Sequence, residues 1–379
     1  MDVPPAAPAR VWLGEQSRGS TQLQPRLRAE LAGITAEDGV ELGTAGIDRA
    51  VTLWNGLFRS IEYSGGHHTA LKLLNGTLAY HSIPELPPYD PAWLAPLADA
   101  PMWQARSWLI YPPTGADMVL WADRQSFTGW DVNGMYLSAA DRPLGTGAPD
   151  RLDWPSTAVL RLPGYVRVSS LEDAPWGILG QWDEGSWMPT PMAEYLHDAG
   201  AQFLIVEALI WPKSRHWLGP HVGMLRRARE SLMACGPDDV AARVLLDIVK
   251  DIYTRMFGGL LRSGPDVGNY NQGATMNPAW ADMLPATGQA RLFRALDKTP
   301  GRLVGSPVYV AGIHVDAAWF VMPAGYEVPP GLTVSTQLGK FKPTARTAWT
   351  PALHAAYVHG DHGALWKALD QAKGSAGGR

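Results

Sequence analysis

Apolar residues recur every three to four positions in several stretches of the chain, a spacing typical of helices that bury one face. Ile47, Val51, Trp54 and Phe58 follow this spacing within a helix predicted over residues 47–59. The same criterion predicts further helices over residues 22–31, 225–234, 240–258, 286–295 and 352–372. Helices therefore account for much of the chain on either side of a central region that lacks this spacing.

Short apolar runs bounded by glycine, proline or polar residues predict strands instead. Such runs cover residues 107–111, 118–122, 129–138, 158–162, 165–169, 203–211, 306–310 and 313–322. The first part of 129–138 reads as a strand and the end as a turn, and the runs over 306–310 and 313–322 lie on either side of Gly312. Together with the helices, these strands predict an α+β fold.

The two helices over residues 225–234 and 240–258 form a predicted hairpin. Gly236 and Pro237 stop the first helix, and the aspartates that follow supply an N-cap for the second. In the second helix, an apolar stripe at i, i+4 spacing predicts one buried face and leaves Lys250 on the opposite, exposed face. A proline-rich stretch over residues 83–101 is the best candidate for a linker between domains.

Composition narrows the class of protein. Hydrophobic residues make up 46% and charged residues 18% of the 379 positions, which indicates a folded chain with an ample core. No apolar run is long enough to predict a membrane span, and the first residues do not resemble a secretory signal. The single cysteine, Cys235, excludes an internal disulfide and a cysteine-based zinc site, and favours a reducing cytosol. High alanine, glycine, proline, arginine and tryptophan contents are typical of a high-GC genome such as that of a phage or mobile element.

Charge is divided unevenly along the chain. Residues 1–210 carry 13 basic and 24 acidic residues, whereas residues 211–379 carry 19 basic and 12 acidic residues. An acidic half followed by a basic half suggests that a polyanion contacts the second half. Chance variation over a solvated surface explains the same numbers equally well.

Two aspartates stand in apolar surroundings that would bury a carboxylate. Asp131 follows an apolar stretch, and Asp316 lies within the run over residues 313–322. A buried carboxylate is costly unless it is paired or binds a cation. Either aspartate alone is more often a strand-end cap or a satisfied core group, and Glu207 stands in a similar apolar run. His362 is interpreted as a solvated loop residue.

Four motifs in order connect these aspartates with Lys250. Residues 131–138 (DVNGMYLS) resemble motif A of the family-B DNA polymerases, D-x-x-S-L-Y-P-S, and residues 250–258 (KDIYTRMFG) resemble motif B, K-x-x-x-N-S-x-Y-G. Residues 314–317 (HVDA) resemble motif C, D-T-D-S, with only the second aspartate kept. Residues 340–342 (KFK) are similar to the lysine-rich motif that follows. The resemblance covers about residues 105–345.

The resemblance implies a polymerase-like palm, an antiparallel sheet with packed helices, in two parts over residues 103–210 and 263–342. It also implies a helical-hairpin fingers insertion over residues 211–262 and a short thumb-like segment over residues 343–379. Residues 1–102 then form an N-terminal domain of unknown role, without an evident exonuclease triad. We therefore expect a minimal member that lacks proofreading.

Asp131, Asp316 and the backbone carbonyl of Val132 are the predicted metal ligands, and the two aspartates with Lys250 are the predicted catalytic residues. Phosphoryl transfer needs hard cations that bridge the attacking oxygen and the phosphates. Carboxylate and carbonyl oxygens are the ligands that Mg²⁺ prefers, so Mg²⁺ is the expected cofactor, with Mn²⁺ as the alternative.

The predicted nucleotide site comprises residues of the hairpin together with Tyr136. Arg226 and Lys250 lie about 13–17 Å from the turn between their helices, so both can flank a triphosphate. The resemblance implies that Tyr136 lies under the sugar and rejects ribonucleotides, and that Thr254 and Gly258 complete the site. Lys250 as a solvated residue and Tyr136 as a core aromatic are the alternatives, and Arg226 is one of three nearby arginines.

The predicted function is the addition of deoxynucleotides from dNTPs to a DNA primer–template or another 3′ end, with Lys340 and Lys342 binding the DNA. One alternative is a catalytically inactive palm-like protein that binds DNA or assembles a replication complex. Another is a template-independent or protein-primed transferase, with a protein primer or an accessory subunit as its partner.

Overall fold

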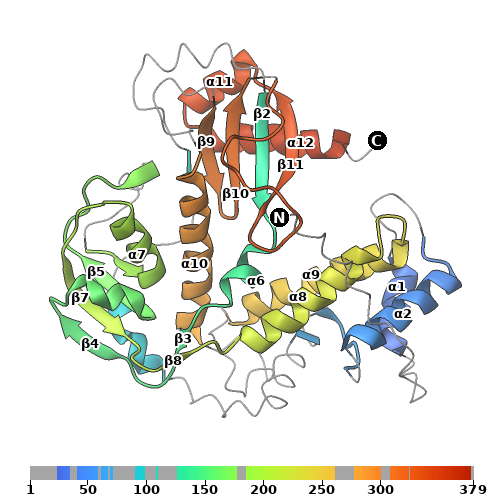
Figure 1. Cartoon of the computed structure of the whole chain (residues 1–379), viewed down its shortest axis with the longest axis horizontal. Helices are drawn as coiled ribbons and strands as arrows, with labels where there is room; N and C mark the ends of the chain where they lie inside the picture. The colour runs from blue at the N-terminus through green and yellow to red at the C-terminus, as the bar shows by residue number, and fades with distance from the viewer. Residues whose placement is uncertain are drawn as a thin grey trace, which may run out of the picture. The chain divides into compact units, whose positions relative to one another are not determined.

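The computed structural model consists of helices and antiparallel sheets arranged in two compact units (Figure 1). One unit comprises residues 1–84 and 220–259, and the other comprises residues 85–219 and 260–379. The structure describes residues 24–34, 41–58, 61–66, 69–70, 90–98, 108–109, 126–176, 185–260, 277–299, 308–323 and 325–376. The mixture of helices and antiparallel sheets confirms the predicted α+β class in its coarse form.

The first unit is helical in its described part. It contains α1 (Pro25–Gly33), α2 (Thr44–Phe58), α8 (Gly219–Ala234) and α9 (Val240–Leu260). Asp239 caps α9 by accepting a 3.0 Å hydrogen bond from the amide of Ala242, and its other carboxylate oxygen lies 3.2 Å from Arg49 of α2. This ion pair ties the start of α9 to α2, and the helical hairpin predicted over residues 225–258 is confirmed.

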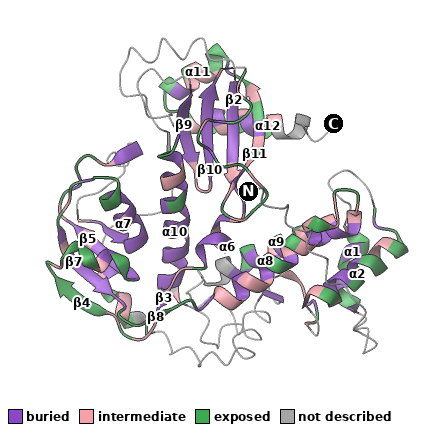
Figure 2. Ribbon diagram, viewed as in Figure 1, coloured by how far each residue is buried: buried purple, intermediate pink, exposed green. Residues whose placement is uncertain are grey.

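The second unit contains a five-stranded antiparallel sheet with the strand order β1-β9-β10-β2-β11. Its strands are β1 (Trp108–Leu109), β2 (Ser126–Val132), β9 (Tyr309–His314), β10 (Ala317–Met322) and β11 (Phe341–Ala348). Every residue of β10 is buried, which explains why its sequence is a continuous apolar run. Figure 2 shows buried residues along β2, β9 and β10. The central strands of this sheet are therefore covered on both faces.

A second antiparallel sheet in this unit has the order β4-β7-β5-β6. Its strands are β4 (Asp150–Asp153), β5 (Gly164–Val168), β6 (Trp187–Pro189) and β7 (Ile205–Ile210). The helix α7 (Thr190–Asp198) packs on this sheet, and α10 (Pro278–Leu296) contacts both α7 and α6 (Met135–Ala139). The short elements are β3 (Leu144–Gly145) paired with β8 (Ser214–Arg215), the 3₁₀ helices η1 (Pro91–Leu94) and η2 (Thr157–Arg161), and α4 (Ala95–Ala98).

Two apolar clusters cover the two faces of the five-stranded sheet. One cluster joins this sheet to the other sheet through α10, with Phe320, Phe293 and Val166 as members from the three elements. The other cluster packs Phe127 and Trp319 of the sheet against α11 (Pro351–Val358) and α12 (His362–Ala376). The five-stranded sheet is thus held rigidly between α10 and the C-terminal helices.

Several strand predictions are wrong. Residues 158–162 form η2 rather than a strand, and residues 129–138 do not form one strand with a turn, because β2 ends at Val132 and α6 begins at Met135. The predicted helix over residues 352–372 is divided into α11 and α12. The strand predicted over residues 118–122 lies outside the described residues.

The border between the two units falls between residues 84 and 85, within the proline-rich stretch interpreted as a linker. The predicted border between residues 342 and 343 falls inside β11. Within the described ranges, no helix is long and apolar enough to cross a membrane.

Candidate active site

Asp131 lies next to the last residue of β2, at the end of the five-stranded sheet. In the strand register it is opposite Ala317 of β10 on one side and Lys342 of β11 on the other. Residues directly opposite each other in antiparallel strands project from the same face. The Nζ atom of Lys342 accordingly lies 3.1 Å from Oδ2 of Asp131. Lys342, predicted to bind DNA, is therefore an immediate neighbour of the first candidate metal ligand.

Asp316 lies in the two-residue loop between β9 and β10, where His314 and Ala317 are paired. Gly312, predicted to lie between two β segments, instead pairs within the sheet with Leu109 and Trp319, and the break between the strands falls at residues 315–316. The loop begins at Val315 with φ 51°, a conformation that is strained for a β-branched residue.

One backbone hydrogen bond joins the loop between β9 and β10 to the end of β2. The amide of Val132, a buried residue adjacent to Asp131, donates a 2.9 Å hydrogen bond to the carbonyl of Asp316. Asp131 and Asp316, far apart in the sequence, are thereby fixed beside each other.

The two carboxyl groups interact directly. Burial raises the pKa of Asp316 to about 6, and the charge of Asp131 and a hydrogen bond between the two side chains act in the same direction. The ammonium of Lys342 lowers the pKa of Asp316 but does not cancel these effects. Two carboxyl groups face one ammonium, so the pair has an excess of negative charge that a further cation would neutralise.

Tyr136 lies on α6, the short helix that follows β2. Gly134 precedes this helix with φ 53°, a left-handed conformation that glycine adopts without strain. The side chain of Tyr136 is half-buried and packs against the core. Burial raises the pKa of Tyr136, and the charge of Asp316 raises it further. Tyr136 is therefore a neighbour of the carboxylate pair, and its ring also packs against the hydrophobic core.

Asn133 connects the end of β2 to the lysine-rich segment. Its amide donates a 2.8 Å hydrogen bond to the carbonyl of Lys340, and its own carbonyl accepts one of 2.8 Å from Gly339. Its side chain donates a 2.7 Å hydrogen bond to the carbonyl of Ser335. The half-buried Lys340 is thus held close in the fold to Asp131, through the residue that follows Val132.

His314, which stands where motif C has its first aspartate, belongs to an aromatic stack. Its ring centroid lies 4.1 Å from that of Trp366 and 5.7 Å from that of His362, both on α12. The ring of His362 also lies 4.7 Å from that of Trp319. His362 is thus part of this packing, and the interpretation of it as a solvated loop residue is wrong.

The remaining predicted residues belong to the first unit. Lys250 and Thr254 are exposed and lie one turn apart on α9, opposite the buried Ile248 and Ile252. Arg226 is half-buried on α8, and its Nε atom has no hydrogen-bond partner among the described residues. Gly258 belongs to α9, and its burial lies outside what the structure describes. Asp131 and Asp316 belong to the second unit.

Glu207, the third carboxylate in an apolar run, lies elsewhere. It is 5% exposed on β7 of the four-stranded sheet and forms ion pairs with Arg151 and Arg167. The Arg167 Nη2 atom lies 2.9 Å from Oε2 of Glu207. Two guanidinium groups already neutralise this carboxylate, which removes it from the candidate metal ligands.

The donor set at the end of the sheet suits a hard cation. The described residues contain no group of three or more histidine, cysteine or acidic side chains arranged to hold a metal. Two carboxylates with excess negative charge nevertheless fit Mg²⁺, which keeps several waters and takes few protein ligands. Val132 adjoins Asp131 in the chain and is the nearest backbone candidate.

The chain was compared with known proteins at three levels. No family model matches it, and no curated protein matches it. Among solved structures it is similar to Phi29 DNA polymerase complexed with single-stranded DNA, at 13% identity and a TM-score of 0.48 over 79% of this chain and 55% of that one. The primer–template complex of the same polymerase gives 13% identity and a TM-score of 0.49 over 80% and 55%. The chain spans about half the length of these polymerases.

Proposed function

We propose that this protein is a nucleotidyltransferase that adds deoxynucleotides to the 3′ end of a DNA strand. The observation that carries the proposal is the pairing of Asp131 with Asp316, held together by the hydrogen bond between Val132 and Asp316. In this proposal the five-stranded sheet is the palm, α8 and α9 are the fingers, and α11 and α12 form a reduced thumb.

The proposed metal site consists of Asp131, Asp316 and the carbonyl of Val132. Mg²⁺ bound there, or Mn²⁺ in its place, would act as the Lewis acid that activates the 3′-hydroxyl and offsets the charge of the phosphates. Lys342 holds the carboxylate of Asp131 in place at 3.1 Å and limits the repulsion between the two aspartates. This arrangement keeps the two carboxylates together before any cation binds.

The proposed nucleotide site consists of Tyr136 beneath the sugar and the hairpin residues Lys250, Arg226, Thr254 and Gly258 around the triphosphate and base. The exposure of Lys250 on α9 supports a contact with a ligand rather than a role in the core. Lys340, held beside β2 by Asn133, is assigned to the DNA backbone, where a lysine neutralises phosphate charge.

Primer extension with the Asp131→Asn variant tests the proposal. We expect template-directed growth of a labelled primer with Mg²⁺ and four dNTPs, and a loss of at least about a hundredfold in the variant, because even residues that only orient metal ligands contribute this much. The exposed Asp370, on α12, gives a matched control, and Asp370→Asn should leave the rate unchanged. Equal rates in the wild-type protein and Asp131→Asn would exclude the site.

Tyr136 has a separate predicted effect on the choice of sugar. Tyr136→Ala should lower the preference for dNTPs over rNTPs by about 10- to 100-fold, since a steric block in a pocket discriminates by such factors. Tyr136→Phe keeps the ring and should keep the preference. Single-nucleotide incorporation with dCTP and CTP measures both ratios, and an unchanged ratio in Tyr136→Ala would contradict the assignment.

A second candidate function is favoured by the ion pair between Lys342 and Asp131. The ammonium group of Lys342 already neutralises the carboxylate that is proposed as the first metal ligand. In that case the chain is a palm-like DNA-binding protein without catalysis. The two functions differ in two measurable ways. A non-catalytic protein binds primer–template DNA equally well with and without Mg²⁺ and shows no extension with either Mg²⁺ or Mn²⁺.

A further inference from the structure

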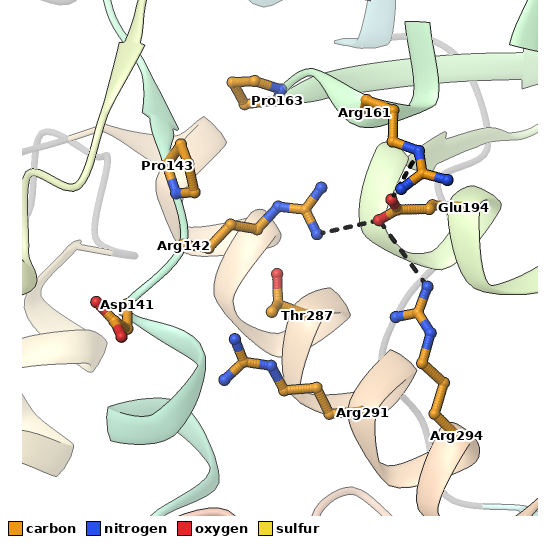
Figure 3. Close-up of a pocket in the computed structure, with 9 residues that line it drawn as sticks. All are labelled: Asp141, Arg142, Pro143, Arg161, Pro163, Glu194, Thr287, Arg291 and Arg294. Carbon is orange, nitrogen blue, oxygen red and sulfur yellow. Dashed lines mark ion pairs between the residues drawn. The ribbon is translucent and has the colours of Figure 1, made fainter. Parts of the chain in front are cut away.

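A pocket of about 320 Å³ opens in the second unit between the end of α6, η2, α7 and α10 (Figure 3). Arg142 follows α6, Arg161 ends η2, and Arg291 and Arg294 lie on α10. Four arginines therefore converge on one pocket from three parts of the chain. None of the residues that line this pocket belongs to the candidate active site described above.

The acidic side chains of the pocket do not match this positive charge. Glu194 of α7 lies 3.6 Å from Arg142, 3.5 Å from Arg161 and 3.9 Å from Arg294. These distances exceed the usual 2.7–2.9 Å of a charge-assisted hydrogen bond between nitrogen and oxygen. One carboxylate is shared among three guanidinium groups without contacting any of them closely. Asp141 is the only other acidic residue that lines the pocket within the described part of the chain.

The arginines also repel one another. Burial lowers the pKa of Arg142, and although Glu194 opposes this effect, the charges of Arg291 and Arg294 lower it further. Burial likewise lowers the pKa of Arg291; the charge of Asp141 opposes this effect, and the charge of Arg294 adds to it. The pocket therefore holds like charges in partly desolvated positions, which is costly without a bound anion.

An unsatisfied hydroxyl group points into the same space. Thr287 is 3% exposed, and its Oγ1 atom has no hydrogen-bond partner among the described residues. Thr287, Arg291 and Arg294 lie at i, i+4 and i+7 on α10, so they share one face of the helix. Figure 3 shows the oxygen of Thr287 directed toward the guanidinium of Arg142. A buried hydroxyl without a partner is costly, and an oxygen of a ligand would satisfy it.

We propose that this pocket binds a phosphate group, carried either by a small molecule or by the backbone or end of a nucleic-acid strand. Arg142 supplies charge and planar donors that match phosphate oxygens, and Thr287 donates its hydroxyl. Arg291, whose Nη1 atom donates a hydrogen bond to the carbonyl of Ser138, adds its charge and its remaining donors. Arg294 is engaged by Asp198 at 3.0 Å and completes the positive wall. The inference does not depend on the proposed polymerase function, because it rests on a different set of residues.

Binding is tested with the full-length protein by calorimetry against inorganic phosphate, pyrophosphate, ADP, and a short oligonucleotide with and without a 5′-phosphate. Arg142→Gln should weaken phosphate binding by roughly tenfold or more, as expected for loss of a charged hydrogen-bond donor. Thr287→Val, which keeps the shape and the net charge, should weaken it by roughly fivefold. Lys367→Gln removes an exposed charge on α12 and should change nothing.

The controls distinguish a specific phosphate site from a general attraction of anions to positive charge. Weaker binding in Arg142→Gln and Thr287→Val, but not in Lys367→Gln, supports the pocket, and the ligand that binds best identifies the source of the phosphate. Equal binding by all four proteins overturns the proposal, as does equal binding of chloride at the same ionic strength. Thermal unfolding without ligand shows whether each variant is folded. Arg142→Gln and Thr287→Val should both stay folded, because Arg142 is partly desolvated among like charges and the hydroxyl of Thr287 has no partner among the described residues.

Discussion

Replacing Asp316 with asparagine should raise the free energy of unfolding by about 1–3 kcal/mol at pH 8 and should abolish nucleotide incorporation. The pKa of Asp316 is about 6 in the folded protein, against an ordinary value of 3.8. The folded state therefore binds the proton more tightly than the unfolded state does. The stability linked to this group is fully present below pH 3.8 and is lost as the pH rises from there through 6. Asparagine imitates the neutral form and should recover that loss.

The measurement is urea unfolding of Asp316→Asn and the wild-type protein at pH 8 and pH 3. The difference between the two proteins should be large at pH 8 and should vanish at pH 3, where the carboxyl group of Asp316 is protonated in both the folded and the unfolded state. Asp370→Asn, at an exposed position, should match the wild-type protein at both values. A variant that is less stable than the wild-type protein at pH 8 would contradict the excess negative charge assigned to the pair.

Replacing Glu207 with glutamine should have the opposite effect on stability. Glu207 is 5% exposed and lies between Arg167 and Arg151 in the centre of its sheet. We expect a loss of about 2–3 kcal/mol, because hydrogen bonds to charged groups contribute about 1.5–3 kcal/mol each and the arginines retain access to water. Primer extension should be unchanged. Urea unfolding at pH 7, compared with the exposed Asp153→Asn on the neighbouring strand, measures the effect.

The two substitutions form a matched pair. Each replaces one carboxylate at a sheet with its amide, and the expected changes in stability have opposite signs because the neighbouring charges differ. Asp316 faces another carboxylate, whereas Glu207 faces two guanidinium groups. Loss of primer extension in Glu207→Gln would return Glu207 to the candidate metal ligands, where the sequence alone had left it.

Elements with a long and regular apolar pattern could be predicted from the sequence. The i, i+4 stripe of α9 and the apolar run of β7 have only one interpretation each, and both are confirmed. Residues 157–161 form a 3₁₀ helix. The strand prediction over residues 158–162 failed because four apolar residues and one arginine are too short a run to separate strand from helix by its period. The sequence places the break between the two apolar segments at Gly312, yet Gly312 pairs within β9. The break lies instead at residues 315–316, and no propensity favours the φ of 51° at Val315.

The candidate site could be predicted only in part. Asp131 and Asp316 were found from their apolar surroundings and from the motifs, but their contact with Lys342 depends on the register between β2 and β11. A lysine-rich motif gives no signal of that register. The arginine pocket gave no signal either, because its four arginines lie in three separate segments that meet only after the end of α6, η2 and α10 have packed.

The place of β2 in its sheet constrains how this protein folds. Thr128 of β2 and its hydrogen-bond partner Phe320 of β10 are 192 positions apart, and Ser126 and Arg346 of β11 are 220 apart. Pairings over such separations are slow, because loop closure costs entropy before any contact forms. During synthesis β2 therefore emerges long before either of its neighbours and presents an apolar strand with two open edges. A chain stalled at that stage has no carboxylate pair and is prone to aggregate, so we expect soluble expression to depend on chaperones that hold β2 until β10 arrives.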